Sequence, residues 1–506
     1  MHNLESSCRF HVTILALENR GPGTRHRRKR ISVMNETDLA FSSIADVARL
    51  LRAGKVSPVE LTELMLARIE RLNPKLNAFI TVTAELARTL AKKAEMELGA
   101  TVRRRKNGRD RGMLHGIPIC LKDNIFTVGV RTTAGSRILR EFIPEQDAAV
   151  VTRLKQAGAV ILGKTNMHEF AYGVTSNNPH YGAVRNPWDV NRIAGGSSGG
   201  SAAALAAGLC FGSIGTDTGG SIRIPAALCG VVGLKPTAKR VEVAGVVPLS
   251  RRLDCVGPLA RSAEDAAILF RAIVPGAKPK GSRGSAAKAS KLSNACLGLP
   301  REFFFDVISG EVQKVFDAGL RASRKLGAKT KEISIPLLNQ TETAGNRIAW
   351  AEATYFHQQS GWFPGRAAEY GEDVRARLEA GTEVAATEYL EGLEQRKKFI
   401  KQLRQAMEAA GVDALVVPTT PIAAPLIGEE RTDVGGDDHS TRALLLRLNR
   451  PANLAGAPAI STPCGVTAMG LPVGLQFIGT ENNEEELLEI AERYERLNPP
   501  TRAPIS

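Results

Sequence analysis

The sequence contains few cysteines, and they form no recognisable motif. The seven are odd in number and widely spaced, and no two form a Cys-x-x-Cys pair. This scatter argues against a disulfide framework and against a zinc site, and it indicates a reducing compartment, which we take to be the cytoplasm. We expect neither a metal nor a cofactor. The cysteines are Cys8, Cys120, Cys210, Cys229, Cys255, Cys296 and Cys464.

The sequence also lacks an apolar run long enough to cross a membrane, so we expect no membrane partner. A short apolar patch, Val12 to Leu17, precedes the basic run Arg25 to Arg30. A secretory signal has the opposite order, with its basic residues first. This patch is therefore not interpreted as a signal.

Acidic residues are scarce in three segments, which together account for the net charge of +15. Residues 1–33, 101–111 and 277–294 each carry a net charge of +5, and the rest of the chain is near neutral. We interpret them as a tail and two surface loops. A basic excess confined to such segments is mostly solvated, so it argues against specific nucleic-acid binding.

Glycine is concentrated in residues 195–225, where two clusters also carry serine. Apolar residues interrupt this stretch throughout, which argues against a flexible linker. No lysine follows the glycines, so the stretch is not a phosphate-binding P-loop. Residues 196–200 satisfy the G-x-S-x-G pattern of a nucleophile elbow centred on Ser198, but the largely polar residues 186–192 stand where that elbow needs an apolar strand. A two-serine site remains.

Such a site needs a base, and Lys122 is the best candidate. Ile117, Ile119 and Leu121 alternate as in a strand that ends at this lysine, so we expect its side chain to be buried. His168 is the alternative base. It follows a predicted strand, where α/β folds place functional loops, but a loop histidine is more often only a polar residue.

Three segments, in this order, resemble the amidase signature hydrolases, which use a Ser–cis-Ser–Lys triad. They read GIPICLKDN at 116–124, GGSSGGS at 195–201 and GTDTGGSIR at 215–223. The resemblance covers roughly residues 40–490. It implies an α/β fold in which helices cover both faces of a mixed central sheet of about eleven strands.

The resemblance also implies a role for each residue of the triad. Ser221 is the nucleophile, Lys122 is the base, and Ser197 relays the proton from Ser221 to Lys122. The peptide bond of Ser197 is expected to be cis. Glycines allow backbone N–H groups to approach a developing oxyanion, and the expected donors are those of Thr218, Gly219, Gly220 and Ser221.

Further residues are expected to support the site or to touch the substrate. Asp217 and Arg223 flank the nucleophile, and family-like sequences use them as an ion pair that holds the glycine loop. Ser198 is expected to form hydrogen bonds within its cluster. Met167 and Tyr172 lie in a segment that lines the site in the family, and we expect them to contact the substrate.

The resemblance predicts a single catalytic domain at residues 35–500, after a disordered basic tail at 1–34. Because family-like sequence begins near Met34, that residue is an alternative start. Within the domain we expect a core at about 75–275, a linker at 276–294, a variable helical half at about 300–411 that forms part of the substrate wall, and returning strands at 412–480, including segments 453–460 and 471–478.

Local patterns predict the elements of the first half. Ser57-Pro58-Val59-Glu60 is a capping box that opens a helix. Apolar periodicity predicts further helices at 43–52, 84–98 and 147–157, and strands at 78–82 and 159–163. Residues 412–418 read as another strand.

The implied activity is hydrolysis of a carboxylic amide to an acid and ammonia or an amine. Our first interpretation is a stand-alone amidase acting on a small molecule, with a homodimer allowed. The alternative is the A-type component of a tRNA-dependent amidotransferase, a glutaminase with partner subunits. Such components typically carry Asp seven residues before the Asn of an N-L-A-G segment, and here Leu446 precedes Asn453 by that spacing. Those components also carry an Asp-Glu-Phe segment, where this chain has His168-Glu169-Phe170. Both differences favour the stand-alone amidase.

Overall fold

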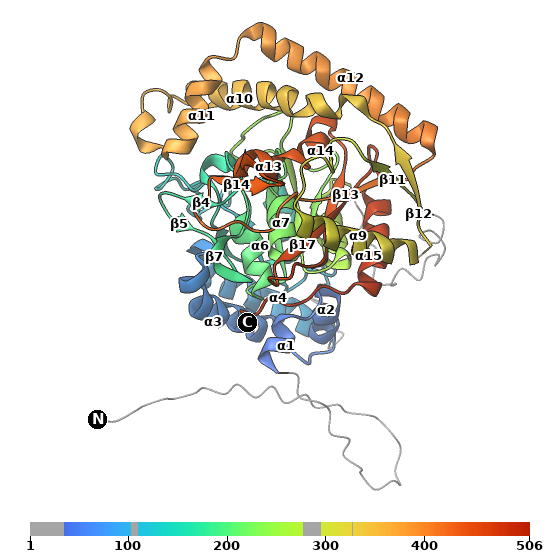
Figure 1. Cartoon of the computed structure of the whole chain (residues 1–506). Helices are drawn as coiled ribbons and strands as arrows, with labels where there is room; N and C mark the ends of the chain where they lie inside the picture. The colour runs from blue at the N-terminus through green and yellow to red at the C-terminus, as the bar shows by residue number, and fades with distance from the viewer. Residues whose placement is uncertain (1–34, 103–109, 277–294, 326, 506) are drawn as a thin grey trace, which may run out of the picture.

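An eleven-stranded mixed sheet forms the centre of the molecule (Figure 1). The computed structural model describes residues 35–102, 110–276, 295–325 and 327–505. The expected tail at 1–34 and residues 277–294 of the expected linker lie outside this part. The strands, in sheet order, are β1 (Phe79–Val82), β3 (Val160–Thr165), β2 (Pro118–Lys122), β8 (Gly212–Asp217), β10 (Cys255–Ala260), β9 (Val232–Lys235), β16 (Ala459–Val466), β17 (Pro472–Ile478), β13 (Ala414–Pro418), β11 (Cys296–Pro300) and β12 (Lys329–Ile333).

The sheet combines parallel and antiparallel neighbours. Strand β2 runs parallel to both β3 and β8, and β11 runs parallel to both β12 and β13. The strands between these groups pair antiparallel, from β8–β10 to β13–β17. The predicted α/β class and mixed sheet are confirmed. Three two-stranded ribbons lie outside the sheet: β4 (Asn177–Asn178) with β5 (Gly182–Ala183), β6 (Arg185–Asn186) with β7 (Asp189–Ile193), and β14 (Arg431–Val434) with β15 (Asp437–Ser440).

Helices pack against the sheet along its length. Helices α3 and α4 contact β3, α6 and α8 contact β8, and α9 and α15 contact β16. The helices are α1 (Glu36–Ala40), α2 (Ile44–Arg52), α3 (Pro58–Leu76), α4 (Ala84–Val102), α5 (Ala149–Gln156), α6 (Gly199–Ala206), α7 (Arg223–Cys229), α8 (Ala263–Ile273), α9 (Gly310–Lys325), α10 (Thr341–Gln359), α11 (Glu372–Thr382), α12 (Ala386–Ala410), α13 (Thr441–Arg447), α14 (Arg450–Ala455) and α15 (Glu484–Leu497).

Helices from different parts of the chain cover the two ends of the molecule. Figure 1 shows α1 to α4 at the lower end and α10 to α12 at the opposite end. Helix α10 packs against α11, α12 and α14. The expected helical half is therefore a cap of long helices, although β11 and β12 of the same region belong to the sheet.

A local sequence signal accounts for the start of α3. The predicted capping box is present: Glu60 N–H donates to Ser57 Oγ (3.1 Å), and Ser57 N–H donates to Glu60 Oε2 (2.8 Å). The other predicted helices and strands of the first half are also found. The expectation for 453–460 was wrong in part, because Asn453 to Ala455 end helix α14 and only Ala459 and Ile460 begin β16.

Helix α6 is built of small residues and is closely surrounded by the rest of the core. All eight of its residues are buried, and it contacts α7, β2 and β8. A Cβ on Gly200 would stand 2.4 Å from the carbonyl oxygens of Ala78 and Asn166. Glycine and alanine therefore let this helix, and the serines before it, sit directly against the sheet.

Two features are absent from the described ranges. None of the helices placed there is long and apolar enough to cross a membrane. Over the same ranges, no group of three His, Cys, Asp or Glu side chains is arranged to hold a metal ion.

Candidate active site

The candidate site lies at the edge of the sheet where the parallel strands β2 and β8 end. Lys122 is the last residue of β2, and Asp217 is the last residue of β8. Because β2 and β8 are parallel neighbours, both strands end at the same edge. The loop that follows β8 carries Ser221 and leads into α7.

Lys122 is fully buried and its amine is surrounded by hydroxyl groups. Its Nζ lies 2.7 Å from Ser197 Oγ and 2.7 Å from Thr216 Oγ1. Burial lowers the pKa of Lys122 to about 7, although the charges of Asp217 and Asp254 oppose this change. The amine is therefore neutral in a large fraction of molecules near neutral pH, as a base must be.

The two adjacent serines, Ser197 and Ser198, point their hydroxyl groups at different partners. The peptide bond between Gly196 and Ser197 is cis, as the resemblance implies. Ser198 Oγ donates to the Thr216 carbonyl (3.2 Å), while its N–H donates to the Ser221 carbonyl (3.2 Å). Ser198 thus joins the two glycine clusters, which is the supporting position expected for it.

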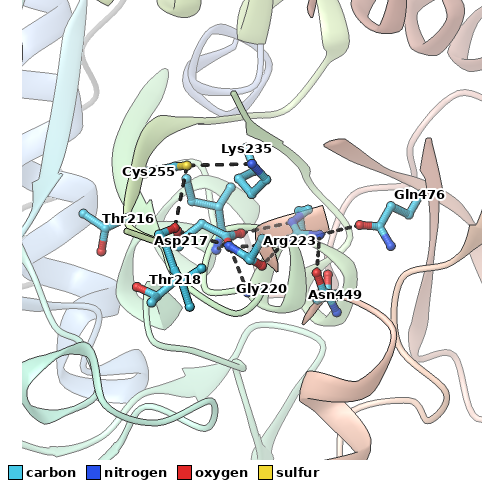
Figure 2. A network of polar contacts seen from close by, with 12 residues as sticks. Thr216, Asp217, Thr218, Gly220, Arg223, Lys235, Cys255, Asn449 and Gln476 are labelled. Atoms are coloured by element: carbon cyan, nitrogen blue, oxygen red, sulfur yellow. Dashed lines mark hydrogen bonds and ion pairs between the residues drawn. The ribbon is translucent and has the colours of Figure 1, made fainter. Parts of the chain in front are cut away.

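A carboxylate holds the loop that carries Ser221. Asp217 Oδ1 accepts the N–H of Gly220 (2.8 Å), and Asp217 Oδ2 accepts the N–H of Ile222 (3.1 Å). Arg223 binds the same carboxylate through two nitrogens, at 3.0 and 3.1 Å, and both side chains are fully buried. The expected ion pair is therefore present, and Figure 2 shows it next to Gly220 of the loop.

This ion pair is enclosed by amides from the end of the chain. Arg223 donates to Gln476 Oε1 (2.6 Å) and to Asn453 Oδ1 (2.5 Å), and Asn453 Nδ2 donates to Asp217 Oδ1 (2.8 Å) (Figure 2 shows Gln476). Burial alone would raise the pKa of Asp217, but Arg223, Lys235 and Asn453 hold this pKa well below its usual range. Asp217 therefore stays charged and keeps the loop in shape at working pH.

One expected oxyanion donor is engaged elsewhere. The Gly220 N–H points at Asp217, so it is not free to bind a developing oxyanion, and the expectation for this residue was wrong. The reason is geometric: Gly220 adopts φ 120° and turns its N–H toward the interior. The backbone N–H groups of Thr218, Gly219 and Ser221 remain as candidates.

Sequence reasoning missed several residues that shape the site. Thr216 binds the Lys122 amine, Asp254 accepts a hydrogen bond from Thr218 Oγ1 (2.5 Å), and Asn453 and Gln476 hold Arg223. Thr216 lies within the G-T-D segment and Asn453 within N-L-A-G, so these motifs marked the two residues without showing their partners. No local signal showed which residues Asp254 or Gln476 would bind.

The backbone N–H of His168 donates to the Ser197 carbonyl (3.2 Å), but the imidazole ring is bound elsewhere. Its Nε2 lies 2.8 Å from Asp373 Oδ2 on α11, and its Nδ1 lies 3.3 Å from Thr175 Oγ1. Both ring nitrogens thus have partners outside the serine clusters. This arrangement favours Lys122 over His168 as the base.

A small cavity of about 30 Å³ opens beside Ser221. Tyr172 lines it, as expected, whereas Met167 is a fully buried residue outside its lining, so we withdraw Met167 as a substrate contact. Helix α10 supplies Ala349 and Trp350 to the lining, and a substrate wall formed by the helical half stays a prediction. The lining residues are Ala171, Tyr172, Gly173, Val174, Thr218, Gly219, Ser221, Leu249, Ala349, Trp350, Arg442, Leu446 and Arg450.

A larger cavity, of about 780 Å³, lies among residues 248–252, α10 and the start of α12. It shares Leu249 with the small cavity, but none of the candidate catalytic residues lines it. We place the chemistry in the small cavity because Ser221 lines that one.

Comparisons with known proteins point to one family. The family model described as Amidase matches residues 60–488. Among curated proteins, the chain is 39% identical over 482 residues to the A-type component of the glutamyl-tRNA(Gln) amidotransferase of Hahella chejuensis, covering 90% of this chain and 96% of that protein. It is 38% identical over 484 residues to the protein of the same name from Roseiflexus sp., and the match again covers 90% of this chain and 96% of that protein.

Solved structures include both amidases and an amidotransferase component. An amidase crystal structure is 36% identical, with a TM-score of 0.81 over 90% of this chain and 99% of that one. The A-type component of the glutamyl-tRNA(Gln) amidotransferase from Thermotoga maritima is 34% identical, with a TM-score of 0.74 over 93% and 99%. The peptide amidase of Stenotrophomonas maltophilia is 30% identical, with a TM-score of 0.76 over 92% and 99%.

Proposed function

Because this chain belongs to the amidase signature family, we propose that it hydrolyses a carboxylic amide through an acyl-enzyme on Ser221. The products are an acid and ammonia or an amine. The observation that carries the proposal is the fully buried Lys122 amine, 2.7 Å from Ser197 Oγ and with a pKa lowered to about 7. A neutral amine in this position can accept a proton at neutral pH.

Acylation begins when Ser221 Oγ attacks the amide carbonyl carbon. The Ser221 proton passes to Ser197 Oγ, and Ser197 gives its own proton to the Lys122 amine. The carbonyl oxygen becomes an oxyanion, which the remaining N–H groups of the glycine loop stabilise. One such donor contributes roughly 3 kcal/mol in the transition state.

The relay then runs backwards. Lys122 returns a proton to Ser197, and Ser197 protonates the leaving nitrogen as the carbon–nitrogen bond breaks. Water next attacks the acyl-enzyme ester, loses its proton along the same path, and releases the acid while Ser221 Oγ regains a proton. No net proton is taken up by the triad over the full cycle.

Two biological roles are compatible with this chemistry. The curated relatives favour the A-type component of an amidotransferase over the stand-alone amidase of our first interpretation, because the relatives described above carry that name. Leu446 favours the stand-alone role, since it puts an apolar side chain in the small cavity where the A-type components typically carry Asp. Co-purification with B-type partner subunits would establish the amidotransferase role.

Replacement of the nucleophile tests the proposal. Ser221→Ala should abolish amide hydrolysis and covalent labelling by a serine-directed phosphonate, because the attacking oxygen is gone. Circular dichroism should show an unchanged fold. Ser198→Ala is the matched control and should still be labelled; if labelling instead disappears only in Ser198→Ala, the nucleophile is wrongly assigned.

A further inference from the structure

The cavity beside Ser221 is lined by two arginines and by no acid. Of the described residues in its lining, Arg442 and Arg450 are the charged ones. Arg442 belongs to α13 and Arg450 begins α14, so two separate helices bring a positive charge to the same small space. Ordinary buried arginines are paired with carboxylates, as Arg223 is here.

Arg450 lies directly over the nucleophile loop. A Cβ built on Gly219 would stand 3.8 Å from both Nε and Cζ of Arg450. Space for this side chain is provided by Gly345 of α10, where an added Cβ would stand 2.6 Å from Arg450 Cδ. A glycine in the middle of a helix is unfavourable by itself, so its presence indicates that the arginine needs this room.

The polar groups around the cavity are short of partners. Arg442 makes no hydrogen bond or ion pair with any described residue, and Arg450 makes one hydrogen bond, from Nη2 to Asn346 Oδ1 (2.9 Å). Within the described part of the chain, four buried atoms of the lining have no hydrogen-bond partner: Nε of Arg442, Nε of Arg450, Oη of Tyr172 and Nε1 of Trp350. All four can donate a hydrogen bond.

The electrostatics of the cavity favour an anion. Burial lowers the pKa of Arg442 to about 9, and the charges of Arg377 and Arg450 act in the same direction. Burial also lowers the pKa of Arg450. The opposing charges of Asp373 and Glu342 act only at longer range, and Asp373 is already paired with Arg377 and His168.

We propose that Arg442 and Arg450 form a carboxylate subsite, so that the substrate is a short amide with a carboxylate at its far end. This inference rests on the proposed function and names its substrate class. One carboxylate supplies acceptors for the unpartnered guanidinium donors and balances the two positive charges. Because Arg450 Nε lies only 3.8 Å from the place of a Cβ on Gly219, two residues before Ser221, the chain between carboxylate and amide is limited to a few carbons.

The same lining predicts which carboxylate-bearing amides are disfavoured. An amino group beside the carboxylate would carry a positive charge next to the two arginines. Leu446 offers that ammonium no counter-charge. Glutaramate should therefore be hydrolysed at least as well as glutamine, which differs from it only by this amino group.

Binding of succinate to Ser221→Ala tests the subsite without turnover. Calorimetry should show that Arg442→Gln and Arg450→Gln, each added to Ser221→Ala, weaken succinate binding by about tenfold or more, because each removes charged donors. Arg447→Gln is the matched control, since Arg447 lies on α13, contacts Asp306 and does not line the cavity. Equal binding in all of these variants, or no binding to the parent, would overturn the subsite.

Steady-state kinetics of the wild-type protein test the carboxylate subsite in a second way. Succinamate carries a carboxylate where butyramide carries a methyl group. The kcat/KM for succinamate should be roughly 100-fold higher, since a site built for polar contacts rejects an analogue that lacks them. Arg450→Gln should remove most of this preference through KM. Butyramide hydrolysed as well as succinamate would overturn the subsite and keep the proposed function. Succinate binding without hydrolysis of any amide would keep the subsite and overturn the proposed function.

Discussion

The dependence of the rate on Lys122 can be worked out from its surroundings. Burial changes the pKa of this lysine from 10.5 to about 7, which corresponds to roughly 5 kcal/mol against the ammonium form. With a pKa of about 7, roughly one-tenth of the lysine is neutral at pH 6 and roughly nine-tenths at pH 8. Because only the neutral form accepts the proton, kcat/KM should rise about tenfold over this range and then level off.

The assay is kcat/KM for one amide substrate, measured from pH 5 to pH 10 in buffers of constant ionic strength. Lys122→Ala should lose most of the rate at neutral pH and less at high pH, where hydroxide partly replaces the base. Lys122→Arg should not recover activity, because a guanidinium keeps its proton in this range. His168→Ala is the control and should keep the same acidic limb.

The sign of the effect follows from the direction of the pKa change. A base with a lowered pKa is neutral above that pKa, so activity is lost as the pH falls and is retained on the alkaline side. A rate that keeps rising above pH 9 would mean that Lys122 has its ordinary pKa. A limb that vanishes in His168→Ala and survives in Lys122→Ala would assign the base to His168 and refute the reasoning.

Two further predictions concern stability and the tail. Arg223→Met should lower the free energy of unfolding by about 3–5 kcal/mol in urea titrations, because Asp217 is left as an unpaired buried charge; adding Asp217→Asn should recover part of this loss, and a purely additive double mutant would argue against the pairing. Deleting residues 1–33 should change neither the rate nor the melting temperature, because their sequence lacks a periodic apolar face; a large loss of folded protein on deletion would contradict this.

Much of the fold and of the catalytic centre could be predicted from short segments. The capping box at Ser57 and the alternation that ends at Lys122 are local patterns, and the structure contains both elements. The three glycine- and lysine-bearing segments identified the family because their order and residue types rarely occur together by chance. The placement of Lys122 beside Ser197 then agrees with the chemistry that the resemblance to this family implies.

Other features of the site could not be predicted, because they depend on contacts between distant parts of the chain. Gly220 was expected to donate to an oxyanion, yet its N–H binds Asp217, and only the turn of the folded loop decides between the two. Asn453 lies more than two hundred residues from Asp217, and Gln476 lies still farther along the chain. A hydrogen bond of this kind leaves no local pattern in the sequence.

The sequence by itself determined the family, the local elements and the residues available for catalysis, because these depend on residue type and short spacing. Only the tertiary structure decided what surrounds Ser221. Arg442 and Arg450 look like ordinary surface arginines in the sequence, but packing of α13 and α14 over the nucleophile loop turns them toward one small cavity. Burial strengthens the attraction of these arginines for an anion, because water no longer screens their charges. It also leaves their unpartnered N–H donors without water as a hydrogen-bond partner.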